Sequence, residues 1–218
     1  MTIEGAVLDK PRTRDAERTK AEILRAARDE FCEQGFNGAR VDAIAARAKA
    51  NKRLLYHYYG NKEALYSAVL LDAYLEIRGG ERELSLGQYD PVEAMDRLVR
   101  FTFRHFLANP WFPRLLAVEN LQNARFLKTL KDIPAINSPL VPQLSDILRR
   151  GAESGAFRKD VDPMQLYISI AGLGYFYVSN MKTLSVIFDR DLSQFALIQD
   201  REAQAVQMVL DYLRTRRS

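Results

Sequence analysis

Basic and polar side chains cluster between residues 40 and 62, and together they could bind nucleic acid. Cationic and tyrosine side chains donate hydrogen bonds to phosphate oxygens, whereas lysine, arginine and asparagine also recognise base edges. The side chains that we assign to phosphates are Arg40, Lys49, Tyr56 and Lys62. Those that we assign to base edges are Asn51, Lys52, Arg53 and His57, with Leu54 placed to contact a thymine methyl group.

The elements that would present these side chains are two short helices joined by a tight turn. Apolar spacing predicts helices over residues 41–48 and 51–58, with Asn51 as the N-cap of the second. A helix-turn-helix places its second helix in the DNA major groove. We expect Leu55, Tyr58 and Tyr59 to pack this second helix against a longer helix over residues 15–34.

The net charge of the 218-residue chain is +4, and its position is informative. Residues 1–62 contain 13 Lys and Arg against 9 Asp and Glu, which gives +4, whereas residues 63–218 contain 19 of each, which gives zero. An anionic partner at the N-terminal end is the simplest interpretation. A chance excess of positive charge is the alternative.

Other readings of the basic residues stay open. Residues 1–14 are polar and basic, and we expect a flexible arm that either contacts phosphates or is only solvated. Lys52 and Arg53 could form a solvated face, and His57 could contact phosphate or solvent instead of a base.

Helical periodicity continues along the chain without the alternation typical of strands, so we predict an all-α protein of about nine helices. We expect a helix-turn-helix domain with three helices over residues 15–62, after the arm, and a larger helical domain over 63–218. Cap residues are predicted at Asp15, Asn61, Asp162 and Ser193. The later helices are predicted over residues 62–80, 91–108, 111–123, 140–154, 163–181 and 194–215, and residues 124–138 are ambiguous because prolines interrupt them.

The order and spacing of residues 35–65 resemble the TetR family of bacterial transcriptional regulators. The match covers about 50 residues. Within the family, the turn at Arg40, the Leu54-Leu55-Tyr56 run and the Asp162-Pro163 helix start are similar to the branch that contains the uracil-sensing regulator RutR. The matching residues are Gly35-Phe36, Val41-Asp42-Ala43-Ile44-Ala45, Lys52-Arg53-Leu54-Leu55-Tyr56-His57-Tyr58-Tyr59 and Lys62-Glu63-Ala64-Leu65.

The chain departs from the family pattern at three positions. Ala39 stands where the family usually has a threonine that caps the first short helix, and losing that cap should cost about 1 kcal/mol. Lys49 replaces a turn glycine, and a left-handed lysine would cost about 1 kcal/mol. Asn51 replaces the usual serine and caps equally well.

The resemblance implies that the larger domain binds a small organic effector, and its aromatic residues suit a partly apolar one. The same residues could simply form core, which is the more frequent role of any single aromatic side chain on a helix. The candidate effector-binding residues are Phe101, Phe106, Trp111, Leu115, Glu119, Asn123, Tyr167, Gly174, Tyr175 and Val178.

The resemblance also implies a homodimer formed through the last two helices, which would present two recognition helices to a palindromic operator. We expect a repressor that the effector releases from DNA. The alternatives are a corepressor-dependent regulator, an activator, or an architectural protein that binds DNA without sequence preference. The dimer candidates are Tyr175, Val178, Phe195, Val206, Val209, Leu210 and Leu213.

Catalytic and metal-binding patterns are absent from the sequence, so we expect neither an enzyme nor a cofactor. The chain has only two histidines and one cysteine, Cys32, and lacks a glycine-rich phosphate loop. No apolar run approaches the roughly 20 residues of a membrane span, and the N-terminal residues lack a signal-peptide core. We therefore expect a cytoplasmic protein.

Overall fold

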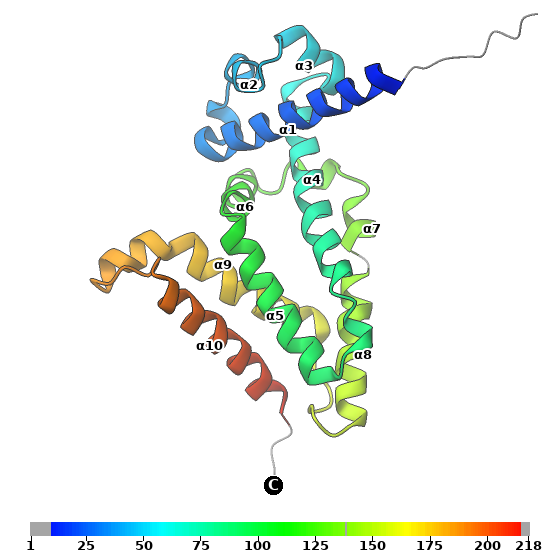
Figure 1. The fold of residues 1–218 in the computed structure, drawn as a ribbon, viewed down its shortest axis with the longest axis vertical. Coiled ribbons are helices and arrows are strands. Elements are labelled where there is room, and N and C mark those ends of the chain that lie inside the picture. The colour runs from blue at the N-terminus through cyan, green and yellow to red at the C-terminus, as the bar shows by residue number, and fades with distance from the viewer. Residues whose placement is uncertain (1–9, 138, 215–218) are drawn as a thin grey trace, which may run out of the picture. The chain divides into compact units, whose positions relative to one another are not determined.

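The computed structural model describes residues 10–137 and 139–214, and most of them are helical (Figure 1). The described part has no β-strand, only an isolated bridge between Phe157 and Arg214, which confirms the all-α prediction. The helices are α1 (Lys10–Gly38), α2 (Val41–Arg47), α3 (Lys52–Tyr59), α4 (Lys62–Glu83), α5 (Pro91–Ala108), α6 (Trp111–Leu121), α7 (Ile133–Asn137), α8 (Leu140–Glu153), α9 (Pro163–Ile187) and α10 (Phe195–Leu213), with short 3-10 helices η1 (Leu86–Gln88) and η2 (Leu127–Thr129).

The chain forms two compact units. The first unit ends at Asp72 and also takes in Ala117–Leu130, and the second unit comprises Ala73–Leu116 and the chain from Lys131 onward. Helices α4 and α6 each contribute residues to both units. The domain boundary that we expect between residues 62 and 63 therefore falls inside α4, near its start.

Helix α1 begins at Lys10 instead of Asp15. Asp15 is not a cap, because its backbone carbonyl lies inside the helix and accepts a hydrogen bond from Thr19 Oγ1 at 2.8 Å. Residues 10–14 of the expected flexible arm are thus helical, and residues 1–9 of the arm lie outside the described residues. Gly35, with φ 68°, interrupts the helix where a left-handed stop is expected.

Helix α4 continues past Gly79 and Gly80, which we expected to end it. A Cβ at Gly80 would lie 2.5 Å from Cζ of Phe101 on α5, so this glycine allows an aromatic ring to approach the α4 backbone. A glycine inside a helix costs only about 1 kcal/mol, which packing of this kind can offset. Helix α9 also runs beyond its predicted end at residue 181, to Ile187.

Cap residues account for several of the other helix starts. Side-chain oxygens of Asn51 and Asn61 each accept a backbone N–H bond at 2.7 Å, at the starts of α3 and α4. Asp162 accepts one from Gln165 at 3.0 Å, with Pro163 in the first turn of α9, as predicted. Ser193 is not a cap, because α10 starts after Gln194 and the Ser193 hydroxyl donates to Asp191 instead.

The core of the second unit forms around α5, which packs against α8, α9 and α10. Gly174 of α9 lies in this contact, since a Cβ there would come within 3.0 Å of the Phe106 ring and 3.3 Å of the Phe103 backbone. Buried side chains from α5, α8, α9 and α10 include Met95, Leu98, Ile147, Leu166, Ile170, Val206, Val209 and Leu213.

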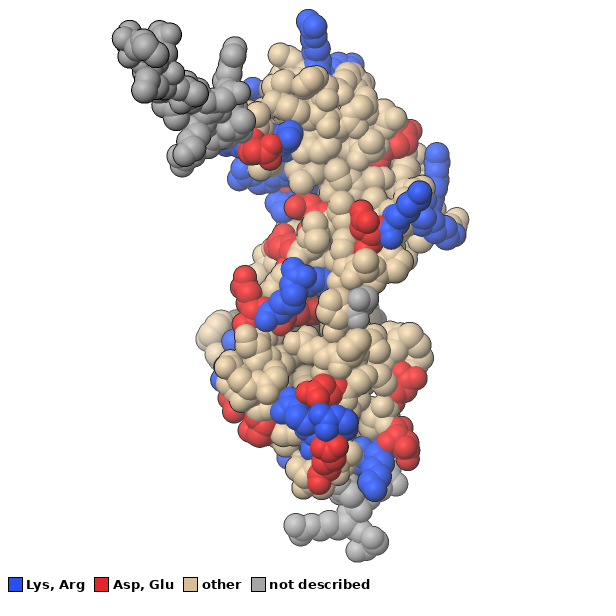
Figure 2. All heavy atoms as spheres, turned by 90° about the vertical axis from the view of Figure 1, so that its right-hand side faces the viewer, with Lys and Arg blue, Asp and Glu red and all other residues tan. Residues whose placement is uncertain are grey.

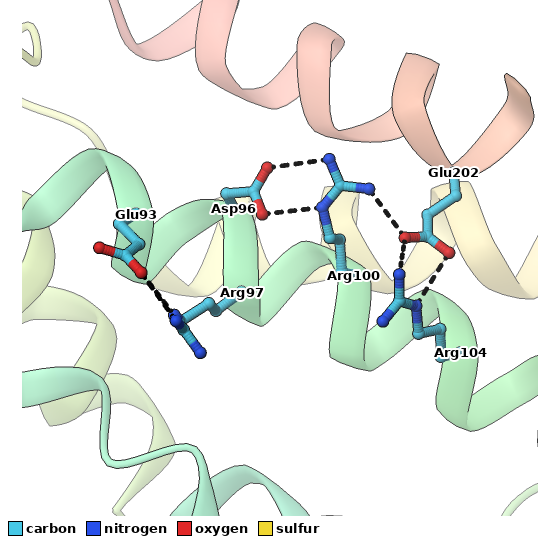
Figure 3. Close-up of polar contacts among 6 residues, drawn as sticks. All are labelled: Glu93, Asp96, Arg97, Arg100, Arg104 and Glu202. Atoms are coloured by element: carbon cyan, nitrogen blue, oxygen red, sulfur yellow. Dashed lines mark hydrogen bonds and ion pairs between the residues drawn. The ribbon is translucent and has the colours of Figure 1, made fainter. Parts of the chain in front are cut away.

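A carboxylate on α10 holds this helix to α5 (Figure 3). Glu202 accepts hydrogen bonds from Arg100 at 2.8 Å and from Arg104 at 2.7 and 3.0 Å. Asp96 bonds the other side of the Arg100 guanidinium at 2.8 Å. The Glu202 side chain is only 9% exposed. Burial favours its neutral form, but Arg104 and Arg100 outweigh this effect and lower the Glu202 pKa.

The turn between α2 and α3 contains a strained residue. Lys49 has φ 51°, in the left-handed region that disfavours a side chain with a Cβ. The turn is closed by backbone hydrogen bonds from Lys49 to Ala46 at 3.1 Å and from Ala50 to Ala45 at 3.0 Å. This confirms the predicted left-handed lysine.

Replacing Glu202 by glutamine should destabilise the protein by about 2 kcal/mol at pH 7, because the amide cannot accept from both guanidiniums as a charged partner. A carboxylate with a lowered pKa stabilises the fold above its unfolded pKa of about 4.3 and loses this contribution as pH falls through the folded pKa. The difference between wild type and E202Q in denaturant unfolding should therefore shrink below about pH 4.3. Asp211→Asn, which breaks an exposed pair with Arg214, is the control and should cost little. A pH-independent difference would contradict the ionic role of Glu202.

Replacing Lys49 by glycine should stabilise the protein by about 0.5–1 kcal/mol, since relief of the left-handed strain exceeds the added entropy of the unfolded glycine. Thermal unfolding should shift upward by about 2–3 °C. Lys49→Ala keeps the Cβ and removes the charge, so it should show no such gain. An equal gain in the alanine variant would mean that charge and not backbone strain is responsible.

Candidate nucleic-acid interface and effector unit

The first helix of the motif, α2, is held to α1 by a buried carboxylate. Glu30 of α1 is 4% exposed, and its Oε1 accepts the backbone N–H of Arg40 at 3.1 Å. Its Oε2 pairs with Arg47 at 3.3 Å. Helix α2 has no side-chain cap, and Ala39 is buried. A carboxylate near the start of α2 therefore partly replaces the cap whose loss the sequence predicts.

Helix α3 is fixed to α1 through its inner face. Leu55 is fully buried, and the Tyr59 hydroxyl donates to the Lys20 carbonyl at 3.0 Å. Tyr58 lies half-buried with the Lys20 ammonium 5.5 Å from its ring centroid. The prediction of a packed inner face is confirmed for Leu55, whereas the two tyrosines are only partly covered. A helix anchored in this way presents its opposite face rigidly.

The outer face of α3 carries the side chains that we assign to bases. Asn51, Lys52, Arg53 and His57 are exposed, Tyr56 is 40% exposed and Leu54 is half-buried. Asn51 Oδ1 already accepts the Leu54 backbone N–H, which uses one of the two lone pairs of this oxygen. A paired contact to adenine would therefore share Oδ1 with the cap of α3.

Two arginines of the motif are exposed and unpaired. Within the described residues, neither Arg40 nor Arg53 forms an ion pair through its guanidinium. Lys52 instead bonds Asp42 at 2.9 Å, and this hydrogen bond raises the Lys52 pKa. An unpaired guanidinium needs no partner exchange before it binds a phosphate or a guanine edge.

The lysines assigned to phosphate differ in exposure. Lys49 is exposed in the turn before α3. Lys62, at the start of α4, is half-buried, with its ammonium 4.9 Å from the centroid of the Phe36 ring and 3.4 Å from the Asn37 carbonyl. The Lys62 ammonium can therefore bind a phosphate only if it releases the Asn37 carbonyl or donates to the carbonyl and the phosphate together.

Charges are paired over much of the second unit. Arg149 bonds both Asp146 and Glu153, and Arg97 bonds Glu93. On the face shown in Figure 2, basic side chains near the C-terminal end accordingly lie beside acidic ones. This agrees with the zero net charge of residues 63–218 and leaves the excess positive charge with the motif.

Aromatic side chains gather in the second unit where the effector is expected. The Phe106 ring stacks on Phe112 at 5.9 Å and meets Tyr175 edge-on at 6.2 Å. Trp111 meets Phe112 at 5.8 Å. Phe106 and Leu115 are buried, and Phe101, Trp111, Tyr167, Tyr175 and Val178 are half-buried.

Three of the predicted effector residues, Glu119, Asn123 and Gly174, lie outside the aromatic cluster or in tight helix contacts. Glu119 and Asn123 belong to the first unit, and Glu119 Oε1 accepts the backbone N–H groups of Phe126 and Leu127 at 2.9 and 2.8 Å. Gly174 lets α9 approach α5 closely, because a Cβ at this position would lie 3.0 Å from the Phe106 ring. Glu119 and Gly174 therefore have structural roles through Oε1 and through close helix packing, whereas Glu119 Oε2 is buried without a hydrogen-bond partner among the described residues.

Buried polar groups that the sequence analysis missed lie beside the aromatic cluster. Arg78 and Glu81 of α4 are 6% and 2% exposed and form an ion pair. The Tyr167 hydroxyl accepts from Arg78 at 2.7 Å and donates to Glu81 at 3.3 Å. Burial and the Glu81 charge raise the Tyr167 pKa to about 12. His105 of α5 is 8% exposed, and burial and then Arg78 lower its pKa. The available signal was an arginine and a glutamate three residues apart, which places both on one face of α4.

The last two helices expose only part of the apolar set predicted for the dimer, and Phe195 of that set is 74% exposed. Val206, Val209 and Leu213 are in the core of their own subunit. The exposed side chains on α9 and α10 instead surround a groove of 520 Å³. Phe176 and Met208 line this groove and are 58% and 51% exposed, and Met164 and Ile168 of α9 are exposed nearby in sequence.

Among the described residues, no group of three or more His, Cys, Asp or Glu side chains could hold a metal ion. In the same residues, no helix is long and apolar enough to cross a membrane.

Comparison with known proteins assigns the chain to a family. Residues 23–69 match the family model "Bacterial regulatory proteins, tetR family", and residues 91–209 match "Tetracyclin repressor-like, C-terminal domain". The repressor NicS of Pseudomonas putida is 36% identical over 194 residues, which cover 89% of each chain. The regulator RutR of Escherichia coli K12 is 31% identical over 162 residues, or 73% of each chain.

A solved structure supports the same conclusion. The putative transcriptional regulator SCO4942 from Streptomyces coelicolor superimposes with a TM-score of 0.65 at 26% identity, covering 89% of this chain and 98% of that one. The matched family models include the helix-turn-helix helices and the helical second unit. The chain therefore belongs to the TetR family of bacterial transcriptional regulators.

Proposed function

We propose that the protein is a homodimeric repressor that binds a palindromic operator through α3 of each subunit and leaves it when a small organic effector binds the second unit. The observation that carries this proposal is the pair of exposed, unpaired arginines, Arg40 and Arg53, on a helix-turn-helix whose inner face is anchored by Leu55 and Tyr59. The relative NicS is named a repressor, which supports this direction of regulation. Such a protein acts in the cytoplasm, where the chromosome is.

The structure refines the expected roles of the DNA-binding residues. Arg53 on the outer face of α3 is the best candidate for a guanine edge, because its guanidinium is exposed and unpaired among the described residues. Arg40 at the start of α2 and Lys49 in the turn flank α3 and suit phosphates. Lys52 exchanges Asp42 for DNA, and Asn51 shares its Oδ1 between the cap of α3 and any base contact.

The dimer forms, in this proposal, through the exposed apolar face of α9 and α10. Phe176, Met208 and Tyr212 are each about half exposed around one groove. Apolar side chains of this size in one groove are typical of a protein interface. A symmetric pairing would bury the same face of both subunits, and a stable interface needs about 800 Å² from each.

Effector binding reaches the DNA-binding helices through α4 and α6, since these helices contribute residues to both units. Leu65 and Tyr66 of α4 are fully buried in the first unit, and Ile77 is buried in the second. A ligand shifts the protein between two states only by the difference in its affinity for them. The effector must therefore favour a geometry in which the two α3 helices no longer fit successive major grooves.

Replacing Arg40 by alanine should weaken binding to a duplex of arbitrary sequence and reduce its salt dependence. Loss of one phosphate contact lowers the slope of log K against log salt by about 0.9. Fluorescence anisotropy with a labelled duplex at several salt concentrations measures this slope. Arg114→Ala, at an exposed arginine on α6 in the second unit, is the control and should leave the slope unchanged. Equal slopes for wild type and Arg40→Ala would exclude Arg40 from the interface.

Replacing Phe176 by glutamate should break the dimer, because it places a charge in the apolar contact. Sedimentation should give twice the 25.0 kDa chain mass for wild type and the single mass for the variant. Val141→Glu, at an exposed apolar residue of α8, should remain dimeric. A Phe176→Glu variant that stays dimeric would place the interface elsewhere.

A further inference from the structure

Three buried nitrogens of the second unit have no hydrogen-bond partner within the described residues: Nε of Arg78, Nε2 of His105 and Nε of Arg201. Arg78 is 6% and His105 8% exposed. A buried donor without an acceptor costs about 1–3 kcal/mol, so proteins rarely keep one unless it serves binding or catalysis. Arg78 and His105 lie close enough for the Arg78 charge to act on the imidazole, so these two groups suggest one recognition site.

The other nitrogens of Arg78 are occupied. Nη1 bonds the Glu81 carboxylate, and Nη2 donates to the Tyr167 hydroxyl at 2.7 Å. This arrangement fixes the guanidinium plane and leaves Nε as the one guanidinium nitrogen without a hydrogen-bond partner among the described residues. The Glu81 charge also balances the Arg78 charge, so the pair offers a hydrogen bond without net positive charge.

The hydrogen-bond chain around His105 fixes where its proton lies. Trp111 Nε1–H can only donate, and it donates to Asn109 Oδ1 at 3.1 Å. The Asn109 amide nitrogen therefore faces Nδ1 of His105, at 3.5 Å, and makes that atom the acceptor. In a neutral imidazole the proton then lies on Nε2. Burial and the Arg78 charge keep His105 neutral by lowering its pKa.

The surroundings of His105 are flat and aromatic. Its ring lies 5.8 Å from the Phe101 ring and 5.5 Å from the Phe112 ring, between centroids. His105 and Phe101 also line an open groove of 610 Å³ along α5, whose other walls carry the arginines Arg97, Arg100 and Arg104 and the carboxylates Glu93 and Asp96. The cavity beside Arg78 and Glu81 holds only 10 Å³. A ligand would therefore enter from the α5 groove and displace side chains to reach Arg78.

We propose that the effector is a small, neutral, planar ring compound with a carbonyl oxygen, which accepts hydrogen bonds from His105 Nε2–H and Arg78 Nε–H. This inference rests on the proposed effector-controlled function and names the chemical class of that effector. Donors without net charge favour a carbonyl over a carboxylate, because a second buried anion beside Glu81 would lack a counter-charge. The aromatic rings favour a flat ligand.

The test compares three probes of similar size on the full-length protein by calorimetry at pH 7.5. Benzamide carries the neutral carbonyl, benzoate the anion and toluene no acceptor. We expect benzamide to saturate with a Kd of about 1 mM, and benzoate and toluene to bind about tenfold more weakly. Tighter binding of benzoate, equal binding of toluene, or no saturation by benzamide at about 5 mM would each overturn the proposal.

Variants of the two histidines of the chain provide matched controls. His105→Phe keeps a ring and removes the donor, so it should weaken benzamide about tenfold and leave toluene unchanged. His57→Phe, on the exposed face of α3, should leave all three probes unchanged. Benzamide binding that survives in His105→Phe would contradict the assignment.

The repressor proposal and the proposed effector class can be contradicted by different results. Absence of DNA binding without ligand would contradict the repressor proposal and leave the benzamide result standing. Release of DNA by an apolar compound such as toluene, with no preference for benzamide, would keep the repressor and exclude this effector class.

Discussion

The continuity of α4 is the constraint on which the rest of the structure depends. This helix starts with Lys62 beside the DNA-binding motif, contributes Tyr66 to the core of the first unit, and carries Arg78 and Glu81 into the second. Tyr66 packs edge-on against Phe126 at 4.9 Å, so the return segment after α6 belongs to the same core. A change at the buried pair of Arg78 and Glu81 therefore acts on a helix that is also part of the DNA-binding unit. Coupling between two sites requires such a shared element.

Local signals in the sequence predicted most of the fold. The helix-turn-helix, the caps at Asn51 and Asn61 and the Asp162-Pro163 start all depend on residues within one helical turn, so a single sequence contains them. The predictions that were wrong depend on distant packing or on competing local bonds. Gly80 does not end α4, because the Phe101 ring lies against it.

The two candidate sites also differ in how far local sequence predicts them. Exposure of Arg53 and burial of Leu55 follow from their positions on one short amphipathic helix. The unmatched donors of Arg78 and His105 depend on how α4, α5 and α9 meet, and on an amide orientation set by Trp111. Aromatic content alone could indicate a ligand-binding region but not its polar groups, since rings form both core and pocket.

Selection of bound duplexes from a random DNA library, at near-physiological salt, tests the central claim most directly. A dimer with one α3 in each of two major grooves should enrich a single palindrome whose half-sites lie about 34 Å apart or somewhat more. The same selection with Arg53→Ala should lose enrichment at one position of each half-site. Binding without enrichment of any palindrome would contradict a sequence-specific regulator and favour a protein that binds DNA by charge alone.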